Sequence, residues 1–475
     1  MKLEKRIVTD STRRADDSSG RDNRKALKLL ATLSLALMVV APAAAQDPVV
    51  TPPQNMVLNN YDSVPIGPFG GLEGSAYVAR VGDPSAAWFN PAGLARQDTA
   101  QISGSAGVYQ FTSISPQALP NQGGAQEQLP NYVGFTFSPR KGYTVGAALI
   151  TTNSWVQETD SEVVNTTAGG QPQRFAYSAD SSFERRMAAF GVGYHGGGHW
   201  RYGGGFAISL MSLRLVASAS DRIDTSTGLQ SLLVDGRTGA SAVQLRVQGG
   251  AQYDVDNWRF GFAMRTPGAT FSKSSNVAFD GTLDRGASSQ GASVFDADAT
   301  TAYHLPWEFQ GGVAYGTPRA ALEFDVHAYT PVSAYALVSS SQPTVVYTDN
   351  GTGVPPSVVT RPFSGLTTAS AGVANVGTGG NLQLFESRTL RVHGGVATNR
   401  SPVTDADQIF NKVNLLSWTL GVSGTFGKFI FAAGVNHKSG SEDSVPLHNL
   451  LNGQAVLTRI DVSTTGLIYS LAYQF

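Results

Sequence analysis

The sequence predicts an all-β protein: a transmembrane antiparallel β-barrel of about 14 strands, with an N-terminal hatch plugging the lumen. Three observations predict this class. Only 15% of the 475 residues are charged and 53 are glycine, whereas soluble chains have about 25% charged residues and about 7% glycine. Apolar and small polar residues alternate with period two along much of the chain. After residue 46 there is no continuous apolar run of about 18 residues that could form a spanning helix.

The first 45 residues have the features of a secretory signal peptide. Basic residues precede a short apolar run from Leu29 to Ala41, and the small residues up to Ala45 form a cleavage site. We therefore expect export with cleavage near Ala45. Removing the nine basic and five acidic residues of this segment from totals of 34 and 35 leaves 25 and 30, a net charge of −5. This balance disfavours a nucleic-acid partner, and the absence of cysteine excludes thiolate chemistry.

The clearest alternation lies near the C-terminus. In residues 416–426 the apolar side chains fall on one face and Ser, Thr and Gly on the other, and residues 466–475 repeat the pattern. A soluble sandwich also alternates in this way. Strands of ten or more residues and aromatic residues at strand ends favour a membrane barrel. The terminal Phe475 resembles the C-terminal signature of bacterial outer-membrane barrels, which the barrel assembly machinery reads.

Short turns are expected on the periplasmic side and long polar loops on the outside. The short turns are 138–142, 195–199, 254–257, 316–319, 375–381 and 427–428, and the loops lie near 154–172, 218–240, 272–300, 335–362 and 439–460. The fourteen expected strands are 99–113, 129–138, 142–156, 173–195, 199–217, 241–254, 257–271, 301–316, 319–333, 364–376, 382–399, 413–426, 428–438 and 462–475.

Residues 67–98 do not alternate and are rich in small residues, so we expect this segment inside the barrel as a hatch. At most two short helical pieces are expected in it, one starting at Asp83-Pro84 and one capped at Asn90. The predicted organisation is therefore a signal peptide (1–45), an extension (46–66), a hatch (67–98) and a barrel (99–475).

Here the sequence resembles the FadL/TodX family of outer-membrane transporters of hydrophobic compounds. The specific part is the hatch, from Gly74 to Arg80 and from Asp83 to Leu94, which contains an Asn-Pro-Ala motif. Weaker matches along the barrel are Arg265-Thr266-Pro267, Leu305-Pro306-Trp307, Arg391-Val392-His393-Gly394 and Ser401-Pro402-Val403.

The resemblance implies passive uptake of long-chain fatty acids or other hydrophobic compounds, such as hydrocarbons, across the bacterial outer membrane. It implies that ligand leaves sideways through a gap in the barrel wall. It assigns the hatch motif to Asn90, Pro91, Ala92 and Gly93. The candidates for ligand contact are Phe69, Tyr77, Trp88 and Phe89, although plain packing of the plug against the wall is the competing interpretation for each. The expected partners are these ligands, outer-membrane lipid and, through Phe475, the assembly machinery.

Two other functions stay open. A general diffusion porin shares the barrel, and a barrel-borne lipid hydrolase shares the location. No cofactor, metal site or catalytic residue is expected, because His195 and His199 share a turn without a neighbouring carboxylate and no nucleophile motif occurs. The sequence does not identify the substrate.

Overall fold

The computed structural model describes residues 57–116, 122–166, 170–225, 228–363, 365–385, 389–448 and 455–475. The predicted signal peptide, with its cleavage site, and residues 46–56 lie outside this range. The helical turns are η1 (Gly70–Leu72), α2 (Ala86–Phe89) and η2 (Pro91–Arg96). The strands are β1 (Gln101–Pro116), β2 (Gln122–Arg140), β3 (Tyr143–Thr166), β4 (Pro172–His195), β5 (Trp200–Thr225), β6 (Gly228–Val255), β7 (Trp258–Arg265), β8 (Ala269–Asp284), β9 (Ser289–Thr301), β10 (Glu308–Gly316), β11 (Ala320–Tyr329), β12 (Val332–Ser339), β13 (Pro343–Asp349), β14 (Ser357–Pro362), β15 (Leu366–Ser370), β16 (Val373–Gln383), β17 (Arg391–Asn399), β18 (Leu415–Phe426), β19 (Phe429–His448) and β20 (Ala455–Gln474).

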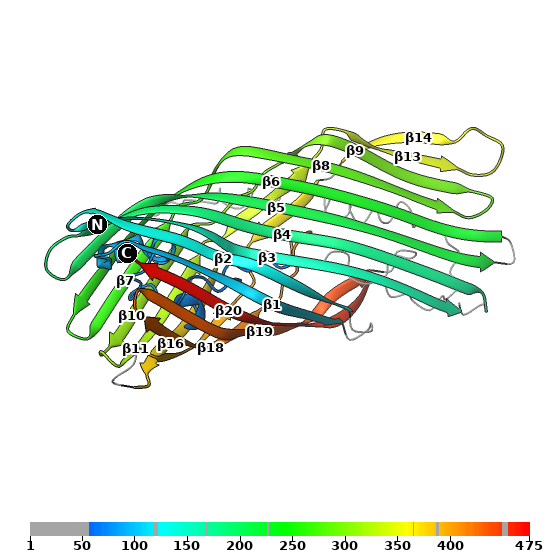
Figure 1. Ribbon diagram of the computed structural model, residues 1–475. Helices are drawn as coiled ribbons and strands as arrows, with labels where there is room; N and C mark the ends of the chain where they lie inside the picture. The colour runs from blue at the N-terminus through cyan, green and yellow to red at the C-terminus, as the bar shows by residue number, and fades with distance from the viewer. Residues whose placement is uncertain are drawn as a thin grey trace, which may run out of the picture.

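These strands close into one antiparallel barrel (Figure 1). The first and last strands pair with each other, from Gln101 opposite Gln474 to Pro116 opposite Ile460. Of the twenty segments, β13 and β14 form a side hairpin, and β7–β8, β9–β10, β11–β12 and β15–β16 each form one interrupted strand. The wall therefore has 14 strand positions, which confirms the predicted fold class. Among the described residues, no helix is long and apolar enough to cross a membrane.

The alternation predicted near the C-terminus is confirmed. On β18, Trp418 and Leu420 are exposed on the outer face, whereas Ser417 and Thr419 are buried toward the lumen. On β20, Leu471 is exposed and Ser470 is buried. The apolar side chains of the outer face are suited to contact with hydrocarbon. Closure of the barrel also satisfies the backbone hydrogen bonds within the wall.

The outer face changes character along the long strands. On β4, the outward side chains from Ala188 to Tyr194 are apolar or aromatic, whereas those from Arg174 to Arg186 are mostly polar or charged. Strand β6 has 28 residues, while about 9–11 tilted residues cross a bilayer. The hairpins therefore extend well beyond any apolar band, and regions predicted as loops, such as 218–240, are mostly strand.

One rim of the barrel carries the start of β1, the end of β20 and six short turns. We call this rim the short-turn end. Five of the predicted short turns are found there. The prediction of a turn at 375–381 was wrong, because these residues lie inside β16 and the turn falls between Gln383 and Arg391. The Gly-rich composition that suggested a turn serves another purpose, since the backbone of Glu73 packs directly over Gly379.

Four consecutive strand positions are interrupted where the sequence predicted continuous strands. The breaks contain Pro267, Pro306, Pro331 and Gly372. Proline has no amide hydrogen to donate to the ladder, and glycine in a strand favours a local bend. The predicted strands 257–271, 301–316, 319–333 and 364–376 therefore needed a break or a shifted boundary.

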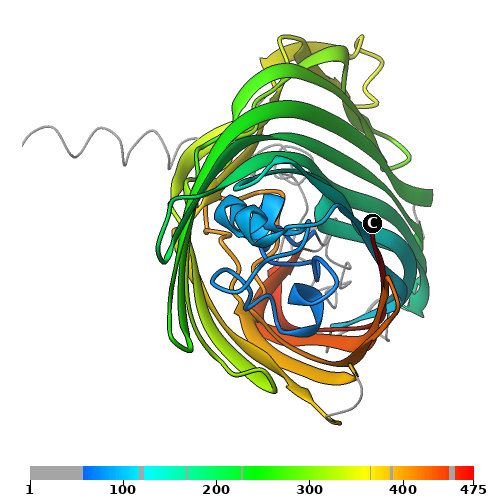
Figure 2. The ribbon, with the colours of Figure 1, turned by 60° about the vertical axis from the view of Figure 1, so that its left-hand side comes forward.

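The segment 57–96 lies inside the barrel, and we call it the plug (Figure 2). It contains three short helical turns, one more than predicted. Residues Val57 to Asn60 are as buried as the later ones, so the internal segment reaches back at least to Val57.

Wall glycines let the plug backbone touch the wall. A Cβ added at Gly203 of β5 would lie 2.2 Å from the carbonyl carbon of Pro91, and one at Gly193 of β4 would lie 2.4 Å from the amide nitrogen of Ala95. Such distances exclude any side chain. Part of the high glycine content is therefore explained by close approach of the plug to the wall.

We expect Gly203→Ala to displace the plug and to destabilise the protein by about 1–3 kcal/mol, the usual range for overpacking. Thermal unfolding and limited proteolysis of the purified protein would measure the effect. Gly311→Ala is the matched control, because nothing lies within 4 Å of a Cβ added at Gly311. Equal behaviour of the two variants would contradict the close contact.

Candidate functional site

A buried ionic cluster holds the plug to β11 and β17. Arg80 forms an ion pair with Glu73 within the plug and donates from Nε to Glu323 of β11 over 2.7 Å. Glu73 also accepts a hydrogen bond from Asn381 (2.8 Å) and lies 2.7 Å from Nδ1 of His393. Burial alone would raise the pKa of Glu73, but Arg80 and His393 outweigh it and hold this pKa below its usual value. Docking against this wall therefore favours the ionised form of Glu73, and the ionised carboxylate in turn stabilises the docked plug.

The predicted hatch motif joins the plug to β6. The side-chain oxygen of Asn90 accepts from the amide of Ala92 (3.1 Å) and caps η2, with Pro91 at its first position. Its side-chain amide donates to the carbonyl of Val78 (3.2 Å) and to that of Ala251 on β6 (3.1 Å). Gly93 packs against the Val81 carbonyl and leaves no room for a side chain. The cap predicted at Asn90 is therefore present.

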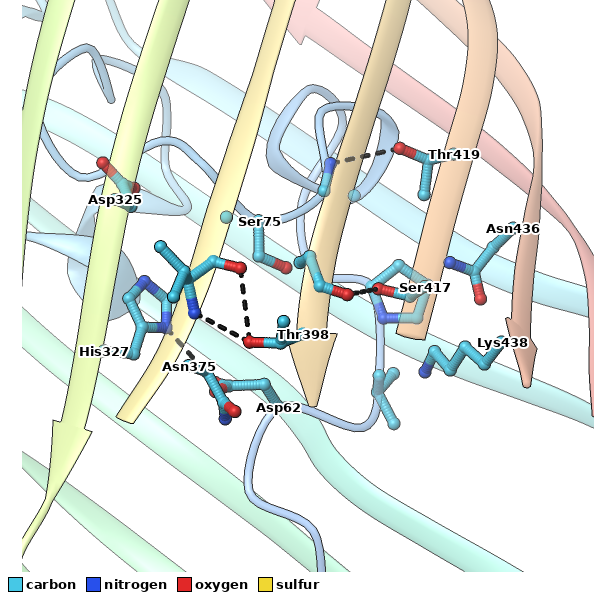
Figure 3. A pocket seen from close by; sticks show the side chains of 17 residues that line it. Asp62, Ser75, Asp325, His327, Asn375, Thr398, Ser417, Thr419, Asn436 and Lys438 are labelled. Atoms are coloured by element: carbon cyan, nitrogen blue, oxygen red, sulfur yellow. Dashed lines mark hydrogen bonds and ion pairs between the residues drawn. The ribbon is translucent and has the colours of Figure 1, made fainter. Parts of the chain in front are cut away.

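A polar cavity separates the plug from β11 and β16–β19 (Figure 3). Asp62 of the plug accepts from Tyr329 (2.8 Å) and Asn375 (2.6 Å) and lies 3.3 Å from Nδ1 of His327. Burial would raise the pKa of Asp62, but His327 and these hydrogen bonds hold it below its usual value. Lys438 points into the same cavity from β19. No pattern in the sequence indicated this second set of polar contacts between plug and wall.

Three of the four predicted ligand-contact residues pack against one another and the wall. Phe69 stacks on His393 with ring centroids 5.6 Å apart, Tyr77 meets Phe69 edge-on, and Phe89 meets Tyr77 edge-on. This cluster fits the packing interpretation. Ligand contact by Phe69, Tyr77 and Phe89 stays a prediction.

Trp88 has a different environment. It lies beneath the guanidinium of Arg265, 3.6 Å from ring centroid to Cζ, and it lines a small enclosed pocket above the plug. The pocket walls are Tyr61, Trp88, Arg185, Met187, Arg246, Leu305, Pro306, Glu308 and Tyr329. Trp88 is thus placed beside a cavity.

Arg185 in this pocket is buried without a carboxylate partner among the described residues. Its guanidinium donates to the Thr152 hydroxyl (2.9 Å) and reaches the Tyr303 hydroxyl at 3.4 Å. A buried cation without a counter-ion is costly and attracts anions. Sequence reasoning missed Arg185, although the period-two alternation that puts Phe190 and Val192 on the outer face of the same strand also places Arg185 inward.

The lumen above the plug is apolar. Phe183 and Met187 of β4 and Met211 and Leu213 of β5 face inward and join a core that continues into the plug. From the other side the loop 400–414 enters the lumen, and the ring of Phe410 meets that of Phe183 at 5.0 Å. Open porins have polar, water-filled interiors. This interior is instead packed with apolar side chains.

The wall opens between β2 and β3. In the described parts of both strands, the backbone pairing stops at Tyr132 and Ile150; beyond these residues β2 is paired with β1, and β3 with β4. One side-chain contact crosses the gap, from the Thr151 hydroxyl to the Pro130 carbonyl (3.2 Å). A bulge after Thr151 bends β3 at this point. The Asn153 side chain, just past the bulge, donates to the carbonyl of Asn60 over 2.9 Å. The plug therefore touches the corner of an unpaired seam.

Within the described ranges, no group of three or more His, Cys, Asp or Glu side chains is arranged to hold a metal ion.

The ionic cluster makes plug docking sensitive to acid. Because the pKa of Glu73 is lowered on folding, its stabilisation is complete above the usual carboxyl pKa of about 4.3 and is lost as pH falls through the lowered value. We expect Glu73→Gln to lower the free energy of plug docking at pH 7 by about 1–3 kcal/mol. We also expect the docking free energy of this variant to depend less on pH in the acid range. Hydrogen exchange of plug amides from pH 7 to pH 3 would measure both. Glu158→Gln on the exposed part of β3 is the control, and an unchanged acid response in Glu73→Gln would contradict the assignment.

The comparisons with known proteins agree with this architecture. No family model and no curated protein matches the sequence. Among solved structures, a Pseudomonas aeruginosa FadL homologue matches with a TM-score of 0.53 and 14% identity, over 90% of this chain and 100% of that chain. The Pseudomonas putida toluene transporter TodX matches with a TM-score of 0.54 and 13% identity, over 87% and 99%. The chain therefore has the fold of these two proteins, a closed 14-stranded barrel.

Proposed function

We propose that this chain is an outer-membrane channel of the FadL/TodX family that carries hydrophobic compounds inward by passive diffusion. Export would use the N-terminal signal, with cleavage near Ala45, and insertion would use the C-terminal strand ending in Phe475. The plug acts as the hatch. The exposed apolar outer face supports contact with membrane lipid.

The apolar lumen above the plug carries this proposal. Amphiphiles cross a water-filled pore poorly, whereas burying apolar surface is worth about 25 cal/mol per Å². Phe183, Met187 and Met211 are positioned to give a hydrocarbon chain such contacts. A polar solute would lose its hydration here, which disfavours the porin alternative. The seam between β2 and β3 is the exit that we assign to the ligand, because the plug contacts it through Asn60.

Uptake in a host that lacks its own transporter tests the function. We expect labelled oleate, an alkane or toluene to accumulate faster in cells that make this chain than in cells that do not. Ion conductance in planar bilayers should stay low until the plug is deleted. Correct insertion without uptake of any of the three compounds would overturn the proposal, and open-pore conductance with the plug intact would favour a porin.

Within this function, long-chain fatty acids are the substrate class that Arg185 favours. Its buried guanidinium lies in the pocket above the plug, without a carboxylate partner among the described side chains. A ligand carboxylate would supply the missing counter-charge, and charge-assisted hydrogen bonds contribute about 1.5–3 kcal/mol.

We expect Arg185→Met to reduce oleate affinity by about tenfold or more and to leave toluene uptake unchanged. Ligand binding by fluorescence competition and uptake of both compounds would measure this. Arg186→Met is the matched control, because Arg186 is exposed on the outer face and pairs with Glu184. Equal losses for oleate and toluene would argue against a carboxylate site at Arg185.

A further inference from the structure

A second seam in the wall lies between the β7–β8 and β9–β10 positions. Strand pairing on the side nearer the short-turn end stops where Arg265 lies opposite Glu308. It resumes only where Ser275 lies opposite Ala299. The edges 266–274 and 300–307 are described throughout, and no backbone hydrogen bond joins them. About eight residues on each side, roughly 26 Å of strand, thus have no backbone hydrogen bonds across the seam.

The two edges differ in how they face their surroundings. Ala269 to Ser274 are all exposed, and Phe271 keeps 64% of its surface accessible. On the other edge, Tyr303, Leu305 and Pro306 are buried toward the lumen. Leu305 and Pro306 also line the pocket above the plug. The seam therefore separates that pocket from the outer surface.

Two inward side chains of β6 bridge the seam from inside. The Gln244 amide nitrogen donates to the Thr270 hydroxyl on one edge (2.9 Å) and to the Tyr303 carbonyl on the other (2.5 Å).

Arg246 repeats this arrangement on the next inward position of the strand. It donates from Nε to the Thr266 carbonyl (2.6 Å) and from Nη2 to the Pro306 carbonyl (3.0 Å), one on each edge. Its remaining nitrogen lies 3.3 Å from Glu308.

These contacts replace a missing backbone ladder with four side-chain hydrogen bonds. Backbone carbonyls facing an apolar interior must be paired, and Gln244 and Arg246 pair three of them. A ladder of this length would have to break cooperatively, whereas two side chains can rotate away. The seam thus closes without the rigidity of a continuous sheet.

From this geometry we propose that the seam is a second lateral door, distinct from the β2–β3 opening, and that Gln244 and Arg246 are its latch. A hydrophobic ligand in the pocket would pass between Phe271 and His304 to the outer surface of the wall. This inference rests on the proposed transport function, but the opening of the seam can be measured without transport.

Distance measurements test the latch directly. The chain has no cysteine, so Phe271→Cys and His304→Cys place one spin label on each edge, both at exposed positions. In reconstituted protein we expect one short distance population. Adding Gln244→Leu and Arg246→Met should produce a second population several Å longer. Arg186→Met in the same background is the control, and identical distributions with and without the latch residues would overturn the proposal.

Cross-linking tests whether ligand uses the door. A reducible bifunctional thiol reagent, matched to the measured distance between the two cysteines, would lock the seam. We expect oleate or toluene uptake to fall at least severalfold and to recover on reduction. Unchanged uptake in the locked protein would overturn the door while leaving the transport function intact. Absence of uptake before locking would instead contradict transport, and the distance measurement would still decide whether the seam opens.

Discussion

The structure depends on one constraint: a backbone group at membrane depth must find its hydrogen-bond partner within the protein. Closing β1 onto β20 meets this requirement for most of the wall. Where prolines interrupt the ladder, the requirement does not disappear. There, side chains provide the hydrogen bonds: Gln244 and Arg246 donate from inside the wall to backbone carbonyls at the break. The same constraint thus explains both the regular part of the barrel and the exceptions that give it openings.

The plug satisfies this constraint in another way. Its short helical turns leave many backbone groups free, and wall side chains such as Gln252, which donates to the Val78 carbonyl, pair with some of them. Wall glycines bring the two backbones together, and buried carboxylates at Glu323 and Asp325 accept from plug amides. The plug is therefore held by polar contacts around its edge rather than by apolar packing alone. Such contacts can be exchanged for water more readily than a packed core can be opened.

The fold could be predicted from the sequence, whereas most of the candidate functional site could not. Alternation has a fixed period, so strands such as β18 and β20 could be predicted from the order of apolar and polar residues alone. Breaks at Pro267 and Pro331 were visible in the sequence, but their alignment into neighbouring interruptions depends on strand register, which one sequence does not specify. Asn90 carried a local signal, since a cap involves residues two positions apart.

The partners of the other functional groups could not be predicted from the local sequence. Asp62, Arg185 and Gln244 each act on partners that are far away in the chain, and only the closed barrel brings them together. The turn misplaced at 375–381 has the same origin: glycine serves both turns and close contacts, and distinguishing them requires knowing that Glu73 lies opposite Gly379.

The loop 400–414 has a mechanical consequence. Asn411 exchanges two hydrogen bonds with Val57, its amide donating to the Val57 carbonyl (2.8 Å) and its side chain accepting from the Val57 amide (2.9 Å). The Asn60 side chain donates to the carbonyls of Asn399 and Val413 on either side of the loop. The loop 400–414, at the rim opposite the short-turn end, is thus hydrogen-bonded directly to the start of the plug. A displacement of this loop would therefore be transmitted to the start of the plug directly through these hydrogen bonds.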